Sequence, residues 1–186
     1  MHSRRNFLRG ASALGGLGLL SACGNPVGSG GGQLIDARVD RTLDYLYATY
    51  PSSRNIAENA VGALVMPVVT EAGLGVGGSY GRGALRIQGQ TVDYYSATQA
   101  SVGLQIGAQQ YAHALFFMAP ESLQTFRTSP GWAAGADLEY ALNDEGTSYG
   151  VDSQVVQGPV VALVFGQSGL LAGATVEGTK YTRIIP

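Results

Sequence analysis

The sequence predicts an α+β fold that is mainly β, with one or two N-terminal helices, a short internal helix, and antiparallel sheets that could close in a barrel-like way. Three observations predict this. The chain has 186 residues, of which 45% are hydrophobic and 13% charged, which suits one domain with a sizeable core. Its 28 glycines stand among apolar and aromatic residues, which is typical of tight turns between strands. The hydrophobic pattern is helical near the N-terminus and strand-like after it.

The helical pattern covers Leu34–Tyr50. Pro51 lies just past this segment, where it would stop a helix. Ser52 or Ser53 could cap a second short helix through about Ala60. The apolar side chains of the first segment recur at spacings of three and four: Ile35, Val39, Leu43, Leu46 and Tyr50.

A stripe of acidic residues runs along the same predicted helix. Asp36, Asp40 and Asp44 recur at a spacing of four and are flanked by Arg38 and Arg41. We expect this stripe to be the solvated face of a helix packed on the core. Three acids along one side of the helix argue against a helix that lies on an anionic membrane surface.

Strand patterns follow the helices. Gln99–Gln109 alternates between apolar and polar residues, which predicts a half-buried strand, whereas Ala114–Met118 is almost wholly apolar and should be buried on both sides. Pro120–Arg127 fits one or two helical turns, and the glycine-dense Gly75–Gly83 is expected to be a turn region. Further short strands are expected at Ala63–Met66, Ala136–Leu142, Val160–Phe165, Leu170–Val176 and Tyr181–Ile185.

The N-terminal residues 1–22 read as a secretory signal peptide. Arg4, Arg5 and Arg9 give a positive start, and the apolar stretch 11–22 is too short for an ordinary transmembrane helix, which needs about 20 residues. The stretch ends in Leu-Ser-Ala-Cys, which resembles a lipobox. In that motif the sulfur of Cys23 receives a diacylglycerol, and cleavage before Cys23 frees an amine for another acyl chain. We therefore expect a lipoprotein anchored at Cys23.

The region around the two arginines also indicates an export route. Ser3–Arg9 (SRRNFLR) resembles the twin-arginine signal, which carries folded proteins, and the alternative is the general export route. Residues 23–33 are expected to be the lipid anchor and a glycine-rich tether, and residues 34–186 a single domain. Gly24 after the cysteine resembles lipoproteins sorted to an outer membrane, so the predicted location is the cell envelope, on the outer membrane facing the periplasm.

The charge of the mature chain would exclude a general attraction to polyanions. Of the 11 Lys and Arg residues, three lie in the signal, which leaves eight against 13 Asp and Glu, a net charge of −5. We therefore expect no nucleic-acid partner, and any binding to anionic lipid requires a local basic patch. Cys23 is the only cysteine, so intramolecular disulfides are impossible.

Residues for catalysis are sparse. After removal of His2 with the signal, His113 is the only histidine, and its apolar surroundings indicate a structural, hydrogen-bonded side chain. The chain has no G-x-S-x-G motif, and its one histidine and lipid-bearing cysteine would not make a zinc site. The carboxylate pairs Asp137/Glu139 and Asp144/Glu145 are expected on the surface. We expect neither an enzyme nor a cofactor or metal.

Four basic residues could form an anion site. Arg82 and Arg86 follow the glycine cluster, and Lys180 and Arg183 lie in the last predicted hairpin. Strand pairing could gather them into one small patch, and the alternative is scattered surface charges.

Four segments resemble the bacterial branch of the SYLF family, in the family's order and over about residues 57–184. They are Gly77–Leu85 (GGSYGRGAL), Tyr95–Gln109 (YSATQASVGLQIGAQ), Phe126–Asp137 (FRTSPGWAAGAD) and Gly169–Lys180 (GLLAGATVEGTK). The resemblance implies a lipid-binding module, which in eukaryotic members binds phosphoinositides and is linked to actin, partly through a basic N-terminal segment. The acidic stripe of the present helix departs from that segment, so neither phosphoinositide nor actin binding is expected here.

These observations predict an envelope lipoprotein with a non-catalytic lipid-binding domain. Its partner would be membrane lipid, bound covalently at Cys23 and non-covalently near Arg82, Arg86, Lys180 and Arg183. The alternative is a structural module that binds another envelope protein.

Overall fold

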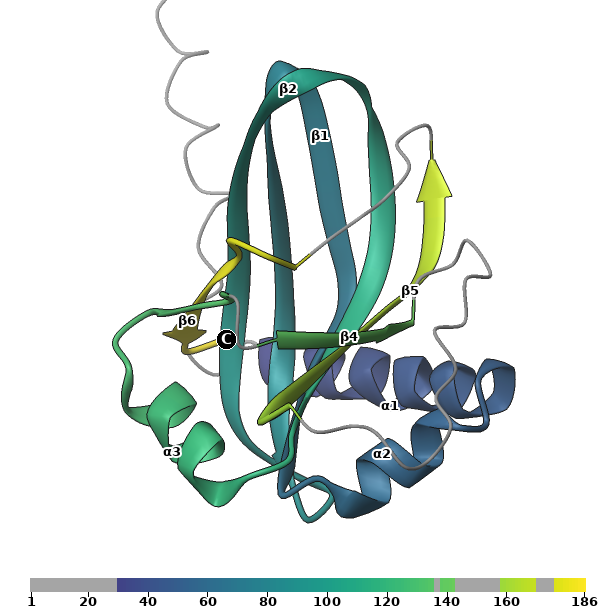
Figure 1. The fold of residues 1–186 in the computed structure, drawn as a ribbon, viewed down its shortest axis with the longest axis vertical. Helices are drawn as coiled ribbons and strands as arrows, with labels where there is room; N and C mark the ends of the chain where they lie inside the picture. The colour runs from purple at the N-terminus through teal and green to yellow at the C-terminus, as the bar shows by residue number, and fades with distance from the viewer. Residues whose placement is uncertain (1–29, 136–137, 143–157, 170–175) are drawn as a thin grey trace, which may run out of the picture.

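The computed structural model describes residues 30–135, 138–142, 158–169 and 176–186. Three helices and a six-stranded sheet make up this part of the chain (Figure 1). The elements are α1 (Gly31–Thr49), α2 (Ser53–Asn59), β1 (Gly62–Ile87), β2 (Gln90–Phe117), α3 (Pro120–Thr128), β3 (Trp132–Ala133), β4 (Leu138–Leu142), β5 (Val160–Gly169) and β6 (Lys180–Ile184). The mainly β, α+β fold with two N-terminal helices and a short internal helix is thereby confirmed.

The predicted helices are present, with small shifts in their ends. Helix α1 begins at Gly31, three residues before the predicted start, and ends at Thr49, because a residue that precedes a proline disfavours the helical conformation. Ser52 is the N-cap of α2 but makes no side-chain capping bond, and the hydroxyl of Ser53 instead donates to the carbonyl of Tyr50 at 2.6 Å. Helix α3 has Pro120 in its first turn, a position where the missing N–H costs nothing.

Strands β1 and β2 form one long antiparallel ribbon that bends back on itself. Gly62 pairs with Phe117 at one end of the ribbon and Ile87 pairs with Gln90 at the other, next to the Gln88–Gly89 turn. Between Leu74 and Val76 the register shifts, and the ribbon bends at the upper end of the molecule in Figure 1. We call residues 73–78 the apex. The bend divides the ribbon into a first arm, which contains residues 62–72 of β1, and a second arm, which contains residues 79–87 of β1. Strand β5 pairs with β2 in the first arm, and β6 pairs with β2 in the second.

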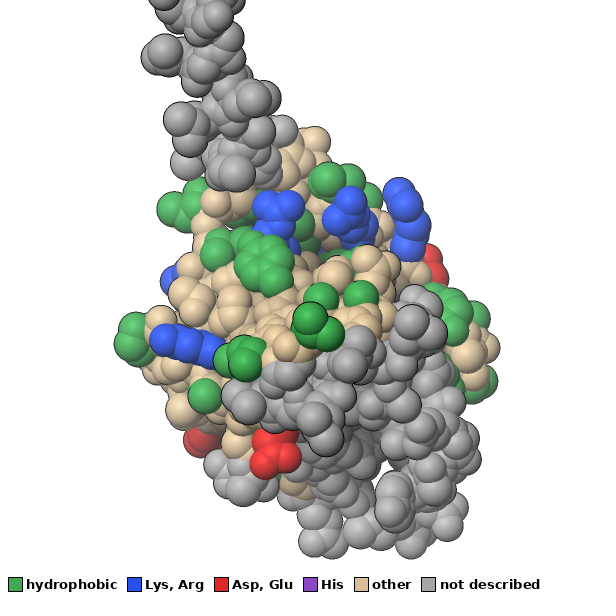
Figure 2. Space-filling view, turned by 90° about the horizontal axis from the view of Figure 1, so that it is seen from above, with side chains coloured by type: hydrophobic (Ala, Val, Ile, Leu, Met, Phe, Trp, Pro, Cys, Tyr) green, Lys and Arg blue, Asp and Glu red, His purple; other side chains and the backbone are tan. Residues whose placement is uncertain are grey.

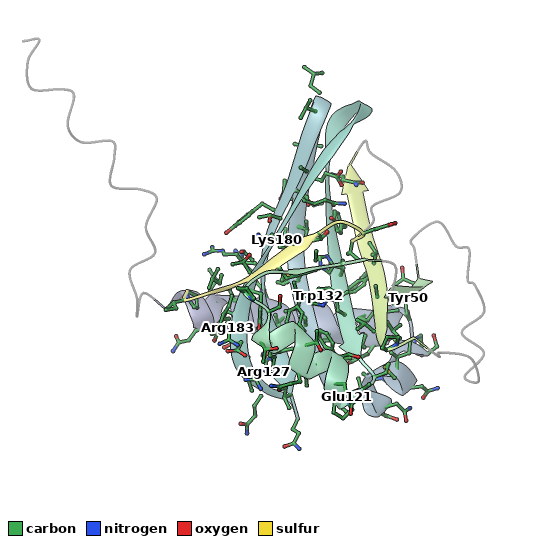
Figure 3. The ribbon with its side chains drawn as sticks, turned by 60° about the vertical axis from the view of Figure 1, so that its left-hand side comes forward. Tyr50, Glu121, Arg127, Trp132, Lys180 and Arg183 are labelled. Atoms are coloured by element: carbon green, nitrogen blue, oxygen red, sulfur yellow. The ribbon has the colours of Figure 1, made fainter. Side chains whose placement is uncertain are left out.

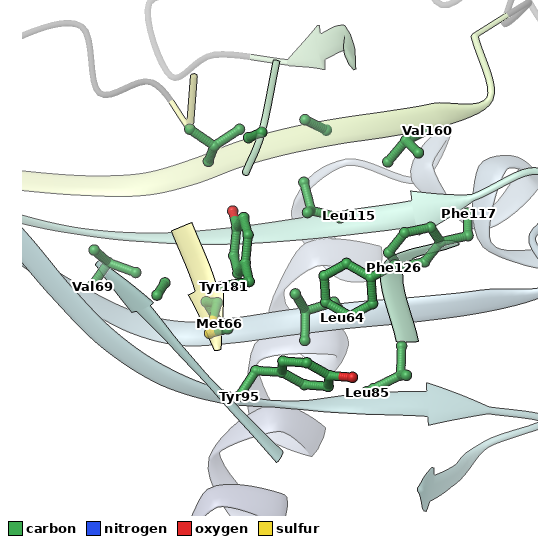
Figure 4. Packing of buried hydrophobic residues seen from close by; sticks show 14 of the residues in the cluster. Leu64, Met66, Val69, Leu85, Tyr95, Leu115, Phe117, Phe126, Val160 and Tyr181 are labelled. Carbon is green, nitrogen blue, oxygen red and sulfur yellow. The ribbon is translucent and has the colours of Figure 1, made fainter. Parts of the chain in front are cut away.

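The bent sheet has an inner and an outer face. The inner face encloses a core that contains Leu64, Leu115, Tyr95, Phe126 and Tyr181, from both arms, α3 and β6 (Figure 4). Outer-face side chains pack against α1 and α2 in a second core, which contains Ile35, Val39, Leu46, Val65, Phe116 and Leu163. The helices therefore cover the outer face away from the apex, and the outer face next to the apex stays uncovered by them.

The two arms of β1 come into close contact at Gly83. A Cβ atom built on Gly83 would lie 2.0 Å from the carbonyl oxygen of Val65, so only glycine permits this approach. The contact draws the two arms together and gives the sheet its half-barrel curvature.

One prediction about the strands is wrong. Residues 75–83 are not a turn region, because all of them belong to β1, and the glycines there serve the bend and the close approach of the arms. The predicted antiparallel, curled sheet is confirmed, and the short β4 adds one parallel pairing with β5. Predicted strands 63–66, 99–109, 114–118, 160–165 and 181–185 coincide with parts of β1, β2, β5 and β6. Cys23, Arg4, Arg5, residues 136–137 and 170–175, and the 144/145 carboxylate pair lie outside the described residues.

Candidate functional site

Helix α1 has an acidic flank that is bonded to the sheet. Asp40 accepts a hydrogen bond from Arg86 at 2.7 Å, and Asp36 lies 3.7 Å from the same guanidinium. Asp36 also accepts hydrogen bonds from Thr91 at 2.7 Å and from the hydroxyl of Tyr94 at 2.8 Å. Burial, together with this bond to Asp36, raises the pKa of Tyr94. The prediction of a solvated acidic stripe is thus wrong for Asp36, which is partly buried and bonded to the sheet, and is confirmed for Asp44 and for Asp40, which is exposed although it pairs with Arg86.

The opposite flank of α1 is basic and borders a groove. Arg38 of α1 and Arg82 of β1 line a cavity of about 260 Å³, and Arg41 lines a second cavity of about 250 Å³. Both cavities are also lined by Pro67 and Val68, so they adjoin at this point of β1. We call the two cavities together the basic groove. They are smaller than the roughly 300–1,000 Å³ of a pocket for a drug-sized ligand, and suit a headgroup better than a whole lipid.

Large hydrophobic side chains are exposed around the basic groove. Leu34 is 51% exposed, Tyr45 48%, Val68 42% and Tyr80 54%, and each of them lines at least one of the two cavities. Figure 2 looks onto the apex end of the molecule and shows basic side chains along one edge of this face, with hydrophobic side chains beside them. Cationic and apolar groups side by side are the chemistry that an anionic membrane surface attracts.

Acids are few on the elements that form the groove. The only acid of β1 is Glu71, which is 9% exposed and accepts a hydrogen bond from Gln109 at 2.9 Å. The only acid of β2 is Asp93, which is engaged by Arg127 at 3.2 Å and Arg183 at 3.3 Å. On α1, Asp36 and Asp40 lie against Arg86 on the other flank, and Asp44 is exposed. The groove is therefore a locally positive region on a chain whose total charge is negative.

The structure divides the four basic residues that the sequence singled out. Arg82 lines the basic groove, whereas Arg86 is held by Asp36 and Asp40 on the other flank of α1. Lys180 pairs with Thr98, which in turn pairs with Tyr80, so Lys180 shares the outer face with Arg82 but lies two strands across from β1. Arg183 lies beside Arg127 near α3, as Figure 3 shows, and donates to the Arg127 carbonyl at 3.2 Å. These residues do not make one patch.

Arg38 and Arg41 are groove residues that the sequence reading treated only as flanks of an acidic stripe. A usable signal was present, because Leu34, Arg38, Arg41 and Tyr45 follow one another at spacings of four, three and four and so share one helix flank.

His113 lies in the core and not in the groove. Its side chain is fully buried, its Nε2 atom lies 2.8 Å from the hydroxyl of Tyr181, and burial lowers its pKa to about 3. The prediction of a buried, hydrogen-bonded histidine is confirmed. Within the described ranges no group of three or more His, Cys, Asp or Glu side chains is placed to hold a metal ion, and no helix there is long and apolar enough to cross a membrane.

Comparison with known proteins gives one family. Residues 98–183, from the middle of β2 to the end of β6, match the family model Ysc84, described as "Las17-binding protein actin regulator". No curated protein matches the chain. Lys180 and Arg183 lie within the matched range, whereas Arg38, Arg41 and Arg82 precede it. The match over residues 98–183 agrees with the resemblance of the four sequence segments to the SYLF family, to which the Ysc84 model belongs.

Proposed function

We propose that this protein is a lipid-anchored envelope lipoprotein whose domain binds anionic membrane surfaces through the basic groove, without catalysing a reaction. The observation that carries the proposal is the convergence of Arg38, Arg41 and Arg82 with exposed apolar side chains on one face of an otherwise acidic chain. The family match supports a lipid partner.

The groove explains how an acidic chain could bind an anionic surface. A basic residue near an anionic membrane contributes roughly 1 kcal/mol, so three guanidiniums contribute about 3 kcal/mol. Two of the three acids of α1, Asp36 and Asp40, are directed away from the groove and partly neutralised by Arg86, which leaves the exposed Asp44 against three guanidiniums. Charge at the groove, and not the net charge, governs the interaction.

Vesicle binding tests this proposal. The full chain is sedimented with vesicles of phosphatidylcholine alone and with vesicles that also contain phosphatidylglycerol. The triple variant R38Q/R41Q/R82Q should lose roughly 100-fold in affinity for the anionic vesicles, following about 1 kcal/mol per residue. The matched control is R54Q/R127Q/R183Q, which removes the same charge from other elements and should bind far more tightly than the groove variant.

Equal losses in the two triple variants would show that only total charge matters and would reject the groove. No binding of the wild-type chain to either vesicle would reject the lipid-binding function itself. Circular dichroism melting of each variant separates unfolding from loss of binding.

The lipid anchor and the location are part of the same proposal. A diacylglycerol on the Cys23 sulfur and a further acyl chain on its amine would give stable attachment, since one chain alone binds only marginally. Radiolabelled palmitate should enter the wild-type chain in cells and not the Cys23→Ser variant. Replacement of Arg4 and Arg5 by lysine should block export if the twin-arginine route is used. Incorporation of palmitate into both the wild-type chain and the Cys23→Ser variant would reject Cys23 as the attachment site.

The absence of an enzymatic reaction is proposed from the place of the one histidine that a mature chain would keep. A general base must reach the proton it removes, and the ring of His113 is enclosed in the core with a strongly lowered pKa.

A further inference from the structure

The apex carries two of the most exposed large hydrophobic side chains in the described part of the chain. Leu74 is 76% exposed and Val76 is 70% exposed. They flank the register shift where the ribbon bends, at one end of the molecule's long axis (Figure 1). A Cβ atom built on Gly73 would lie 2.9 Å from the Cα of Gly77, so the bend is tight and the tip is narrow.

The apex and the basic groove lie along one face of β1. Burial alternates along the second arm, with Ser79 and Gly81 buried and Val76, Tyr80 and Arg82 directed outward. At about 3.3 Å per residue, Tyr80 lies roughly 13 Å from Val76 along the strand and Arg82 about 7 Å further. The order from the tip is therefore apolar, then aromatic, then cationic.

The charges around the apex fit the same order. Between Glu71 and Arg82 the sequence of β1 has no charged residue, and β2 has none from Tyr94 to Phe117. On β1 and β2 the acid nearest the tip is Glu71, which is buried against Gln109 and does not project from the surface. Among the other described residues, the exposed Glu177 lies beside Gln99, whose strand partner is Ser79.

We propose that the apex inserts into the bilayer, with Leu74 and Val76 in the hydrocarbon edge, Tyr80 in the headgroup layer and Arg82 with Arg38 on the phosphates. This inference rests on the proposed lipid-binding function and adds an inserted anchor to a charged contact. The headgroup layer of one leaflet is roughly 5–8 Å thick, so an apex some 13 Å from Tyr80 can reach the hydrocarbon while the arginines remain outside it. An aromatic ring between the two zones takes the interfacial position that tyrosine favours.

The place of helix α1 agrees with this orientation. Gly31, the first residue of α1, lines the same cavity as Tyr80 and Arg82. The segment that leads to the predicted anchor at Cys23 therefore joins the body on the groove side. Six residues lie between Cys23 and Gly30, so the two Cα atoms are at most about 25 Å apart, which lets anchor and apex meet one membrane.

Fluorescence quenching by lipid tests the insertion in the full chain. The substitution Val76→Trp places an indole at the apex. The matched control is Val92→Trp, at a site that is 41% exposed and lies close to the Gln88–Gly89 turn, away from the apex. Trp132 is the only native tryptophan, so the wild-type chain gives the background. In anionic vesicles that contain lipids brominated on their acyl chains, the Val76→Trp signal should be quenched, and neither the control nor the background should be.

A second variant measures what insertion contributes to binding. L74N/V76N should weaken binding to anionic vesicles by roughly 10- to 100-fold and should remove the part that resists high salt, since burial of each apolar side chain is worth about tenfold. Both side chains are exposed, so melting should be unchanged.

The possible outcomes separate the two proposals. If the Val76→Trp chain sediments with vesicles but is not quenched, or if L74N/V76N binds like wild type, insertion is rejected and the charged contact stands. If no chain sediments with any vesicle, both proposals are rejected.

Discussion

The guanidinium of Arg86 lies 2.7 Å from the carboxylate of Asp40, and this ion pair joins the C-terminal end of β1 to helix α1. Because Arg86 is paired, it is not available to bind an external anion, and the charge of Asp40 repels such an anion less. The pair lies on the flank of α1 opposite to Arg38 and Arg41, and it agrees with the packing of Ile35, Val39 and Leu46 on the sheet, which leaves the basic flank at the groove. The electrostatics of the candidate site therefore depend on a contact outside it.

The Asp36 carboxylate should be the more important of the two acids for stability. It accepts hydrogen bonds from Thr91 and Tyr94 and is 30% exposed at its side chain. Asp36→Asn should lower the free energy of unfolding by about 1–2 kcal/mol, since hydrogen bonds to a charged acceptor are worth about 1.5–3 kcal/mol and water screens this site. Asp44→Asn, on the exposed side of α1, should change it by less than about 0.5 kcal/mol. Urea denaturation measures both, and equal effects would contradict the docking role of Asp36.

Gly83 should be intolerant of any side chain. A Cβ atom there would overlap the backbone oxygen of Val65, which cannot rotate away, so Gly83→Ala should cost about 3 kcal/mol or more or prevent folding. Gly135→Ala is the control, because a Cβ atom there meets nothing within 4 Å. The amounts of soluble protein and the melting temperatures of the two variants decide the matter, and a stable Gly83→Ala chain would show that the arms do not touch.

The sequence predicted the fold class and most elements because their signals are local. The three- and four-residue spacing in α1, the stop at Pro51 and the alternation in Gln99–Gln109 each depend on neighbours in the chain. The extent of β1 was not predictable in this way. Its glycines read as turn residues, and their reason lies in contacts with Val65 and Val68, more than ten residues away.

The candidate site was only partly predictable for the same reason. Arg82 stood out in the sequence as a cation near the glycines, and it lines the groove. Whether Arg86 is free, in contrast, depends on the docking of a helix about 50 residues earlier. Arg38 and Arg41 were visible in the helical period, yet which flank of α1 faces the sheet is a tertiary fact. Net charge pointed away from anionic lipid because it sums over flanks that the fold separates.

Phe126 should be the most sensitive side chain of the inner core. The centroid of its ring lies 4.7 Å from the ring centroid of Tyr95, 4.9 Å from that of Phe117 and 5.4 Å from that of Trp132. The residue is 1% exposed. Phe126→Ala should lower the free energy of unfolding by about 3–5 kcal/mol, whereas Val92→Ala, at an exposed site, should have little effect. Urea denaturation followed by Trp132 fluorescence reports the change directly. A loss below about 1 kcal/mol would mean that α3 is not packed on this core.

Because of His113, the stability of the domain should decrease as the pH is lowered from 6.5, before the carboxylates begin to titrate. Its pKa is about 3 in the folded chain because of burial, against 6.5 when unfolded. Above pH 6.5 both states are neutral at this ring. Between pH 6.5 and 3 the unfolded chain takes up a proton that the folded chain does not, so stability decreases by up to about 1.4 kcal/mol per pH unit.

The slope between pH 6.5 and 5 isolates this histidine, since ordinary Asp and Glu remain ionised there. His113→Gln should flatten that slope. Tyr181→Phe, which removes the hydroxyl 2.8 Å from Nε2 but leaves the ring buried, should keep it. Urea midpoints measured at half-unit intervals of pH give the slopes. The same slope in wild type and His113→Gln would show that the histidine is protonated in the folded chain, or that another group controls the acid response.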